Sequence, residues 1–411
     1  GAAAERMARV LASGRYATEL LLRAPEAVAM LGSTADLAPR ERAPLEAEVL
    51  AGVGRHDDPV AAIGVVRAMR RRELFRVTVA DLVGLAPVDV VGEALTAIAE
   101  ATLSGALAAA VRAIESERRG PLPTRLAVVA MGRLGGREMG YASDADVLFV
   151  HSPLFEAAEK DAADAALAVA NEMRRLLSLP STEPALAVDA GLRPEGKSGP
   201  LVRTLSSYGA YYERWGEVWE RQALLRAAPC CGDPELLRRF IALVDPLRWP
   251  TEGLSADQVR EVRRIKARVE SERLPRGADP SMHLKLGPGG LADVEWCAQL
   301  LQLRHGARVP ALRTTATVAA LDAAVDAGLL DAADRAVLVD SWRRAAAIRN
   351  ATVLVTGRPS DAMPKGPRAL ASVSRVLGYG PGESPVFVDD YRRAARQARA
   401  VVERVFYDDP R

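Results

Sequence analysis

The sequence predicts an α+β protein that is mostly helical, with a small mixed β-sheet core between an N-terminal helical region and a C-terminal helical bundle. Two observations support this fold class. The composition is rich in alanine, leucine and valine, with 49% hydrophobic but only 5% aromatic residues, which favours helices with small interior side chains. Apolar runs typical of buried strands occur at 126–131 and 147–150, whereas apolar residues elsewhere follow helical spacing.

The 411 residues are enough for two or three domains. We expect a helical region at 1–120, a core that contains the sheet at 121–252 and a helical bundle at 253–411. Gly328, Gly357 and Gly378 stand where helices should end. From apolar spacing and breakers, helices are predicted at 17–22, 25–31, 44–53, 58–83, 87–114, 156–177, 205–215, 217–228, 255–273, 290–304, 314–327, 331–356, 367–377 and 384–406.

Charge and cysteine content limit the classes of function. Lys and Arg number 55 against 53 Asp and Glu, so no overall field attracts nucleic acid or a membrane surface. We find no signal peptide and no apolar run long enough to span a bilayer, and expect a cytoplasmic protein without a nucleic-acid or membrane partner. Cys230, Cys231 and Cys297 are expected as small buried hydrophobes, although Cys230-Cys231 could also bind a metal or oxidise.

The most informative stretch is 126–150, where a glycine cluster and two aspartates separate the two apolar strands. Asp144 and Asp146 are two residues apart and should point to the same side of a strand. Two such carboxylates repel each other unless a cation lies between them, and hard oxygen ligands suit Mg²⁺. The glycines at 132, 135 and 136 offer backbone N–H groups to a phosphate. Together these features predict a site for a nucleoside triphosphate and a metal ion.

The whole block at 132–146, GRLGGREMGYASDAD, resembles the glutamine synthetase adenylyltransferases of the polymerase-β-type nucleotidyltransferase superfamily. Three later segments resemble the same family: 189–201 (DAGLRPEGKSGPL), 215–227 (WGEVWERQALLRA) and 283–295 (HLKLGPGGLADVE). The resemblance covers most of the chain and is densest from 132 to 295. It implies that the sheet-containing core is a nucleotidyltransferase catalytic core.

The resemblance also implies a reaction and a set of site residues. AMP would pass from ATP to a tyrosine hydroxyl of glutamine synthetase, with release of pyrophosphate. Asp144 and Asp146 would hold two Mg²⁺ ions, for which Mn²⁺ could substitute, and Asp189 would bind the ion nearest the attacking group and could accept its proton. The residues implied for nucleotide binding are Gly135, Gly136, Ser143, Arg193 and Lys285.

Some of these residues also have structural interpretations. Asp189 could be a structural aspartate with Arg193 as its partner, and Lys285 could contact a phosphate or simply lie beside a tight turn. Asp293 and Glu295 are explained by acidic residues at the positive end of a helix.

Three further features lie outside the carboxylate and glycine motifs. Trp219 is expected in the core, because an indole at helical spacing is usually buried. Glu220, Arg221 and Arg226 could reach the mouth of the site or form surface pairs. The run at 70–72, all arginine, is interpreted as a solvated helix face rather than a phosphate site.

The direction of the reaction is predicted from two residues. Members of the family pair a unit that removes AMP with one that attaches it, and Gly140-Tyr141 matches the attaching unit. The end of the chain soon after Tyr407 also favours that unit. The PII nitrogen-signalling protein is expected as a regulator. Alternatives are the AMP-removing unit, a different target protein such as PII, or a catalytically silent binding module, against which the intact aspartates argue.

Overall fold

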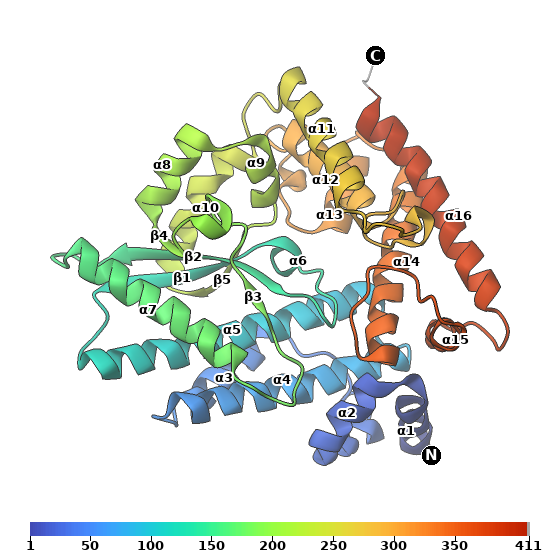
Figure 1. Cartoon of the computed structure of the whole chain (residues 1–411), viewed down its shortest axis with the longest axis horizontal. Coiled ribbons are helices and arrows are strands. Elements are labelled where there is room, and N and C mark those ends of the chain that lie inside the picture. The colour runs from blue at the N-terminus through green and yellow to red at the C-terminus, as the bar shows by residue number, and fades with distance from the viewer. Residues whose placement is uncertain (409–411) are drawn as a thin grey trace.

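The computed structural model describes residues 1–408 and confirms a mostly helical α+β fold (Figure 1). The N-terminal part contains α1 (Ala2–Ser13), α2 (Arg15–Arg23), α3 (Arg42–Val53), α4 (Pro59–Leu82) and α5 (Val88–Arg118). The middle part contains β1 (Thr124–Ala130), α6 (Gly132–Gly135), β2 (Ala145–Pro153), α7 (Glu159–Ser178), β3 (Val188–Asp189), β4 (Val202–Thr204), α8 (Leu205–Trp215), α9 (Val218–Leu224), β5 (Ala228–Gly232) and α10 (Pro234–Arg248). The C-terminal part contains α11 (Ala256–Arg273), α12 (Leu291–His305), α13 (Thr317–Asp326), α14 (Ala332–Thr356), α15 (Pro367–Val376) and α16 (Ser384–Val402).

The sheet is mixed, with the strand order β3-β2-β1-β5 and with β4 also paired to β2. β1 runs antiparallel to β2 and β5, whereas β3 and β4 run parallel to β2 at its two ends. The pairing of β2 with β3 places Asp146 directly beside Asp189. The predicted strands at 126–131 and 147–150 are therefore the two central strands, and the second one begins at the aspartate motif.

Alternation along the central strands divides the core into two layers. Val128 and Phe149 belong to the buried cluster that includes α5 and α7, whereas Val129 and Leu148 belong to the cluster formed with α8 and α10. In Figure 1 the sheet lies between these two sets of helices. The sheet is thus buried on both faces, and only the strand ends are free to present polar side chains.

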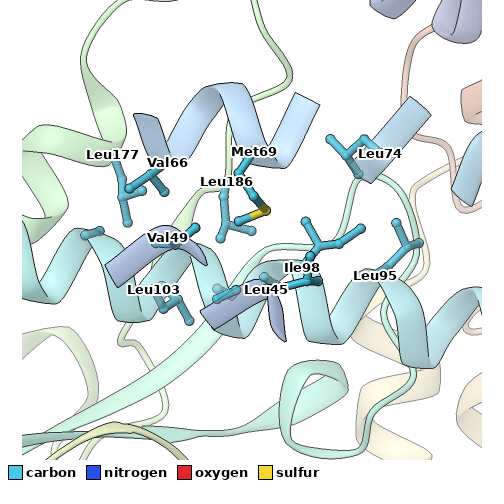
Figure 2. Packing of buried hydrophobic residues seen from close by; sticks show 14 of the residues in the cluster. Leu45, Val49, Val66, Met69, Leu74, Leu95, Ile98, Leu103, Leu177 and Leu186 are labelled. Atoms are coloured by element: carbon cyan, nitrogen blue, oxygen red, sulfur yellow. The ribbon is translucent and has the colours of Figure 1, made fainter. Parts of the chain in front are cut away.

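The N-terminal helices and the sheet share one hydrophobic core rather than two. Figure 2 shows Leu45 of α3, Val66 of α4 and Ile98 of α5 packed together with Leu177 and Leu186, which belong to the α7–β3 region. This continuous core crosses residue 120, where the sequence predicts a division. The domain boundaries stay a prediction.

The C-terminal helices form a second core, made mainly by α12, α13, α14 and α16. α14 joins the two halves, because Val353 and Leu354 at its end are buried in the first core. An ion pair between Arg343 of α14 and Asp89 of α5 adds a polar contact between them. Gly328, Gly357 and Gly378 have positive φ angles at helix ends, as predicted.

Helix α5 corrects one expectation from the sequence. Val88–Arg118 is long and apolar enough to cross a membrane by length and composition alone, so the statement that no such run exists was wrong. In the structure 89% of its most apolar window is buried. A helix buried to this extent is typical of the core of a protein, where apolar residues are needed on every face.

Two elements after the aspartate motif also differ from the prediction. The helix expected at 217–228 ends at Leu224, and Ala228–Gly232 forms strand β5 on the edge of the sheet. Helix α10 was not predicted. Its signals are present in the sequence: Asp233 caps the helix by accepting from the Leu236 N–H, and Pro234 occupies the first turn.

Candidate active site

A cavity of about 890 Å³ lies between the end of the sheet and the C-terminal bundle. This volume is within the usual range for sites that bind small molecules. Its walls come from the turn around α6, the start of β2, helices α9, α11, α12 and α14, and the segments around 285 and 360. Charged side chains are unusually frequent among its lining residues: Arg133, Asp144, Asp146, Arg226, Arg273, Lys285, Glu295, Arg349 and Asp361.

The structure brings the three predicted aspartates together at the ends of two neighbouring strands, β2 and β3. Asp146 is the second residue of β2, Asp189 is its register partner on β3, and Asp144 directly precedes β2. Asp144 and Asp146 line the cavity, and Asp189 is exposed beside them. The Asp189 Oδ1 atom accepts a hydrogen bond from the Gly191 N–H at 2.7 Å, which leaves Oδ2 for other partners.

The electrostatics of Asp146 reflect this crowding. Its pKa is raised to about 6, first by burial and then by the negative charges of Asp189 and Asp144, while Lys285 lowers it. The carboxylates are thus close enough to repel one another. Among residues 1–408, no group of three or more His, Cys, Asp and Glu side chains is arranged so that it could hold a metal ion. The three aspartates are therefore neighbours, but they do not form a preassembled metal cage.

In the structure, Gly135 and Gly136 of the glycine turn pack against the protein itself. The turn forms the short helix α6, in which the Gly135 N–H donates to the Met131 carbonyl oxygen and the Gly136 N–H donates to that of Gly132. A Cβ atom on Gly135 would overlap the backbone of Arg226, and one on Gly136 would overlap the Arg226 guanidinium. Neither glycine lines the cavity. Close packing against Arg226 thus accounts for both glycines.

Gly132 is the glycine that faces the aspartates. It has a φ of 52°, which favours glycine, and a Cβ atom there would overlap the Asp146 carboxylate. Gly132 lines the cavity together with Asp146 and Ser143. The space that this glycine leaves open is therefore the space in front of Asp146.

Ser143 closes the turn that carries Asp144. Its Oγ atom accepts from the Gly140 N–H at 2.8 Å, and its own N–H donates to the Gly140 carbonyl oxygen. Tyr141 anchors the same turn to α4, because its hydroxyl donates to Asp81 at 2.8 Å. Gly140 packs against the side chain of Asn350. Gly140 and Tyr141, on which the predicted direction depends, thus contact the protein interior.

Arg193 holds the loop that follows Asp189. Its guanidinium donates to the carbonyl oxygens of Ala190, Lys197 and Gly199 at 2.8 to 3.0 Å. Within residues 1–408 it forms no ion pair with Asp189, so the alternative in which the two are partners was wrong. Arg193 is not among the residues that line the cavity, and its nucleotide contact stays a prediction.

The second glycine-rich segment divides its roles between Lys285 and Asp293. Lys285 is exposed and lines the cavity. Asp293 is 2% exposed and pairs with Lys266 and Arg399, while it accepts from the Gly289 N–H. The structural interpretation of Asp293 is therefore correct.

Glu295 belongs to the cavity instead, together with residues that the sequence did not single out. Glu295 pairs with Arg133 at 3.3 Å and accepts from the Trp342 indole N–H. Arg349 pairs with Asp361 at 2.6 Å on the same side of the cavity. Arg133 lies inside the recognised glycine block, but nothing local in the sequence marks Arg349 or Asp361, because their neighbours are distant in the chain.

Three further interpretations are corrected by burial. Trp219 is 38% exposed and lines the cavity, so it is not a core residue. Arg226 is buried, and it pairs with Glu138 and donates to Thr317. It is therefore neither part of a surface ion pair nor a free side chain at the mouth of the site. Arg70 is also buried, with 7% exposure, so the arginine run is not a solvated face.

A small mixed sheet with aspartates on neighbouring strands beside a large charged cavity is the arrangement expected of a nucleotidyltransferase. The family model of glutamate-ammonia ligase adenylyltransferase matches residues 4–242, and that of GlnD PII-uridylyltransferase matches residues 262–406. The chain therefore belongs to the glutamate-ammonia ligase adenylyltransferase family.

Curated relatives agree with this family assignment. The chain is 57% identical, over 99% of its length, to the bifunctional glutamine synthetase adenylyltransferase/adenylyl-removing enzyme of Streptomyces coelicolor. It is 52% identical over 99% of its length to the protein of the same name from Nocardia farcinica, and 47% identical over 98% to that from Mycobacterium tuberculosis. The matches cover 42%, 41% and 41% of those relatives. The chain thus spans about two fifths of their length.

Proposed function

We propose that this chain transfers AMP from ATP to a tyrosine hydroxyl of glutamine synthetase and releases pyrophosphate. The observation that carries the proposal is the register of β2 and β3, which sets Asp146 beside Asp189 at the edge of a cavity large enough for a nucleotide. The names of the relatives supply the protein substrate and the group transferred. A tyrosine of a folded protein must enter from solvent, and Asp189 and Asp144 are exposed at that edge.

A divalent cation fits the donor set. Three carboxylates meet where no Lys or Arg forms an ion pair with them among the described residues, and the pKa of Asp146 is raised by the other two. Mg²⁺ is typically held by one or two carboxylates together with substrate phosphates, which agrees with the lack of a preassembled cage. In this proposal Asp144, Asp146 and Asp189 hold Mg²⁺, or Mn²⁺ in its place. When bound, the metal neutralises charge on the phosphate groups and lowers the pKa of a coordinated hydroxyl.

The protein's own contribution is to position the reactants and accept a proton. The tyrosine hydroxyl has an ordinary pKa of about 10, so it must lose its proton to attack at neutral pH. We assign that proton to Oδ2 of Asp189, because Oδ1 already accepts from Gly191. The phenolic oxygen then forms a bond to the α-phosphorus while the bond to the bridging oxygen of pyrophosphate breaks. The hydrogen-bonded turn from Gly140 to Ser143 fixes the backbone that leads into Asp144.

The direction of transfer rests on the resemblance of Gly140-Tyr141 to the attaching unit. The alternative is the unit that removes AMP by phosphorolysis, which uses the same carboxylates. Because Tyr141 bonds Asp81 and Gly140 packs on Asn350, the two residues would act through the shape of the turn rather than by touching the substrate. PII as a regulator, a cytoplasmic location, and the absence of nucleic-acid and membrane partners are also proposals drawn from the sequence.

Two aspartate substitutions test the site. The double variant Asp144→Asn/Asp146→Asn should lose pyrophosphate release with ATP and unmodified glutamine synthetase by roughly a thousandfold or more, since removal of metal ligands removes the charge neutralisation. Mg²⁺ should raise the melting temperature of the wild type but not that of the variant, because only the wild type binds it. Equal Mg²⁺ stabilisation of both proteins would reject the metal assignment whatever the activity.

A further inference from the structure

Charged side chains of both signs line each side of the cavity, but those that form no ion pair among the described residues are acidic at the end of the sheet and basic in the C-terminal part. The end of the sheet contributes Asp144 and Asp146, with Asp189 next to them. The C-terminal part contributes Arg273 at the end of α11, Lys285 before α12 and Arg349 in α14. Figure 1 shows these C-terminal elements on the side of the sheet where α6 lies.

The two other arginines of the cavity are already engaged by protein groups. Arg133 pairs with Glu295 and donates to the carbonyl oxygen of Glu138. Arg226 is held between Glu138 and Thr317. Arg133 thus uses its Nε and Nη1 atoms, and Arg226 its Nη1 and Nη2 atoms, to donate to protein groups.

The three cations of the C-terminal wall are less constrained. Within the part of the chain that the structure describes, Arg273 and Lys285 form no ion pair and donate no side-chain hydrogen bond. Arg349 pairs with Asp361, but its Nε atom is buried and has no hydrogen-bond partner among the described residues. An arginine donor that is left unpaired inside a cavity is costly unless a ligand accepts from it.

Lys285 and Arg349 also lie close to one another. The N–H of Leu284, next to Lys285, donates to the carbonyl oxygen of Asp361 at 2.7 Å, and Arg349 pairs with the carboxylate of the same Asp361. Lys285 also lies near enough to Asp146 to lower its pKa. Among the three cations, Lys285 is therefore the one that acts on Asp146.

We propose that the wall formed by Arg273, Lys285 and Arg349 binds the polyphosphate tail of the nucleotide, in the place of the glycine turn at 135–136. The N–H groups of Gly135 and Gly136 donate to carbonyl oxygens at the start of α6, so these two glycines do not offer them to a phosphate. Guanidinium and ammonium groups supply charge-assisted hydrogen bonds to phosphate oxygens, which are stronger than neutral ones.

The proposal gives the C-terminal bundle a role in the candidate site. Arg273, Lys285 and Arg349 all lie within residues 262–406, outside the segment matched by the adenylyltransferase family model. The nucleotide would bridge the two parts, with its reactive phosphate at the aspartates and its tail on the bundle. The inference rests on the proposed function in one respect: the proposed function names ATP as the molecule that carries the polyphosphate.

Tripolyphosphate without divalent ions is the probe, because it lacks the base and the sugar and cannot react. Titration calorimetry should show that tripolyphosphate binds to the full chain. Lys285→Met or Arg349→Met should each raise the dissociation constant roughly tenfold, because each removes one charge-assisted contact. Lys365→Met is the matched control for the lysine, because Lys365 is exposed and lies outside the cavity. Arg260→Met, on the exposed face of α11, is the control for Arg273→Met.

Asp361→Asn separates a phosphate contact from a structural role of Arg349. It breaks the same ion pair but leaves the arginine in the cavity, so the affinity for tripolyphosphate should be unchanged or higher. The proposal would be overturned if Asp361→Asn and Arg349→Met lowered the affinity for tripolyphosphate equally, or if Lys285→Met and Lys365→Met changed it equally. It would also be overturned if the wild type did not bind tripolyphosphate. Failure of AMP transfer with intact tripolyphosphate binding would reject the proposed function alone.

Discussion

At the scale of single residues, two carboxylates are partly buried: Asp146 in the site, and Asp81 behind the turn that leads to Asp144. Asp146 and Asp81 both have their pKa raised to about 6, and in both cases burial is the largest cause. Asp146 has two acidic neighbours, whereas Asp81 accepts a hydrogen bond from Tyr141, which lowers its pKa in part. Asp81 thus anchors the aspartate-bearing turn at a cost to stability when it is ionised.

The charge on Asp81 gives a pH-dependent prediction. Because the pKa in the folded protein lies above the ordinary value of 3.8, the folded state favours the protonated form, and stability is lost as the pH rises through about 6. Asp81→Asn keeps an acceptor for Tyr141 without the charge. Urea denaturation at pH 8 should show the variant more stable by on the order of 1–2 kcal/mol. This difference should shrink at pH 4.5, and a difference that is the same at both pH values would contradict the role of the charge.

Packing at Gly135 gives a second prediction at this scale. Gly135→Ala should lower the free energy of unfolding by about 2 kcal/mol or more, because the new Cβ atom would overlap the carbonyl oxygen of Arg226, which is backbone and cannot move aside. Gly64→Ala is the control, since nothing lies within 4 Å of that position in α4. It should raise stability by about 0.5–1 kcal/mol. A stability of Gly135→Ala equal to that of the wild type would show that the turn is open as the sequence suggested.

At the scale of elements, helix α4 holds the segment that delivers Asp189. Arg67 donates to the carbonyl oxygens of Leu176 and Leu179 at the end of α7, and Arg71 forms an ion pair with Glu183. Further along this segment, the Ala187 carbonyl oxygen accepts from the Ala145 N–H, so β3 is aligned with β2. Arg67 and Arg71 of α4 therefore bind the protein itself, and α4 helps to position the strand that carries Asp189.

The ion pair between Arg71 and Glu183 can be tested by its effect on turnover. Arg71→Met should loosen the loop before β3 and lower kcat by roughly tenfold, equivalent to about 1.4 kcal/mol, while the KM for ATP changes little. Limited proteolysis should cut the segment 179–187 faster in this variant. The charge swap Arg71→Glu/Glu183→Arg should recover part of the loss, and Arg175→Met, at an exposed pair on α7, should have no effect. Wild-type kcat in Arg71→Met would contradict the positioning role.

At the scale of the whole molecule, the candidate site lies between two hydrophobic cores. The first joins the N-terminal helices to the sheet, the second fills the C-terminal bundle, and α14 contributes to both. The first part contributes Asp144 and Asp146 to the cavity, and the second contributes Arg273, Lys285 and Arg349. The relative position of the two parts thus sets the distance between the aspartates and the cations.

The fold and half of the site could be predicted because their signals are local. The strands at 126–131 and 147–150, the helix periodicity and the Asp144–Asp146 spacing are all visible within a few residues. β5 was missed because Ala228–Gly232 is short, contains Pro229 and does not alternate clearly. The exposure of Trp219 and the presence of Arg349 in the cavity depend on contacts distant in sequence, which no local pattern encodes.

The most direct test of AMP attachment follows the label. The full chain is incubated with Mg²⁺ and ATP labelled at the α-phosphate, together with unmodified glutamine synthetase, and in parallel with phosphate and the adenylylated enzyme. Label should appear on a tyrosine of glutamine synthetase in the first mixture, and the Asp189→Asn variant should lose this transfer. Release of ADP in the second mixture, without any label on glutamine synthetase in the first, would contradict AMP attachment and identify the chain as the AMP-removing unit.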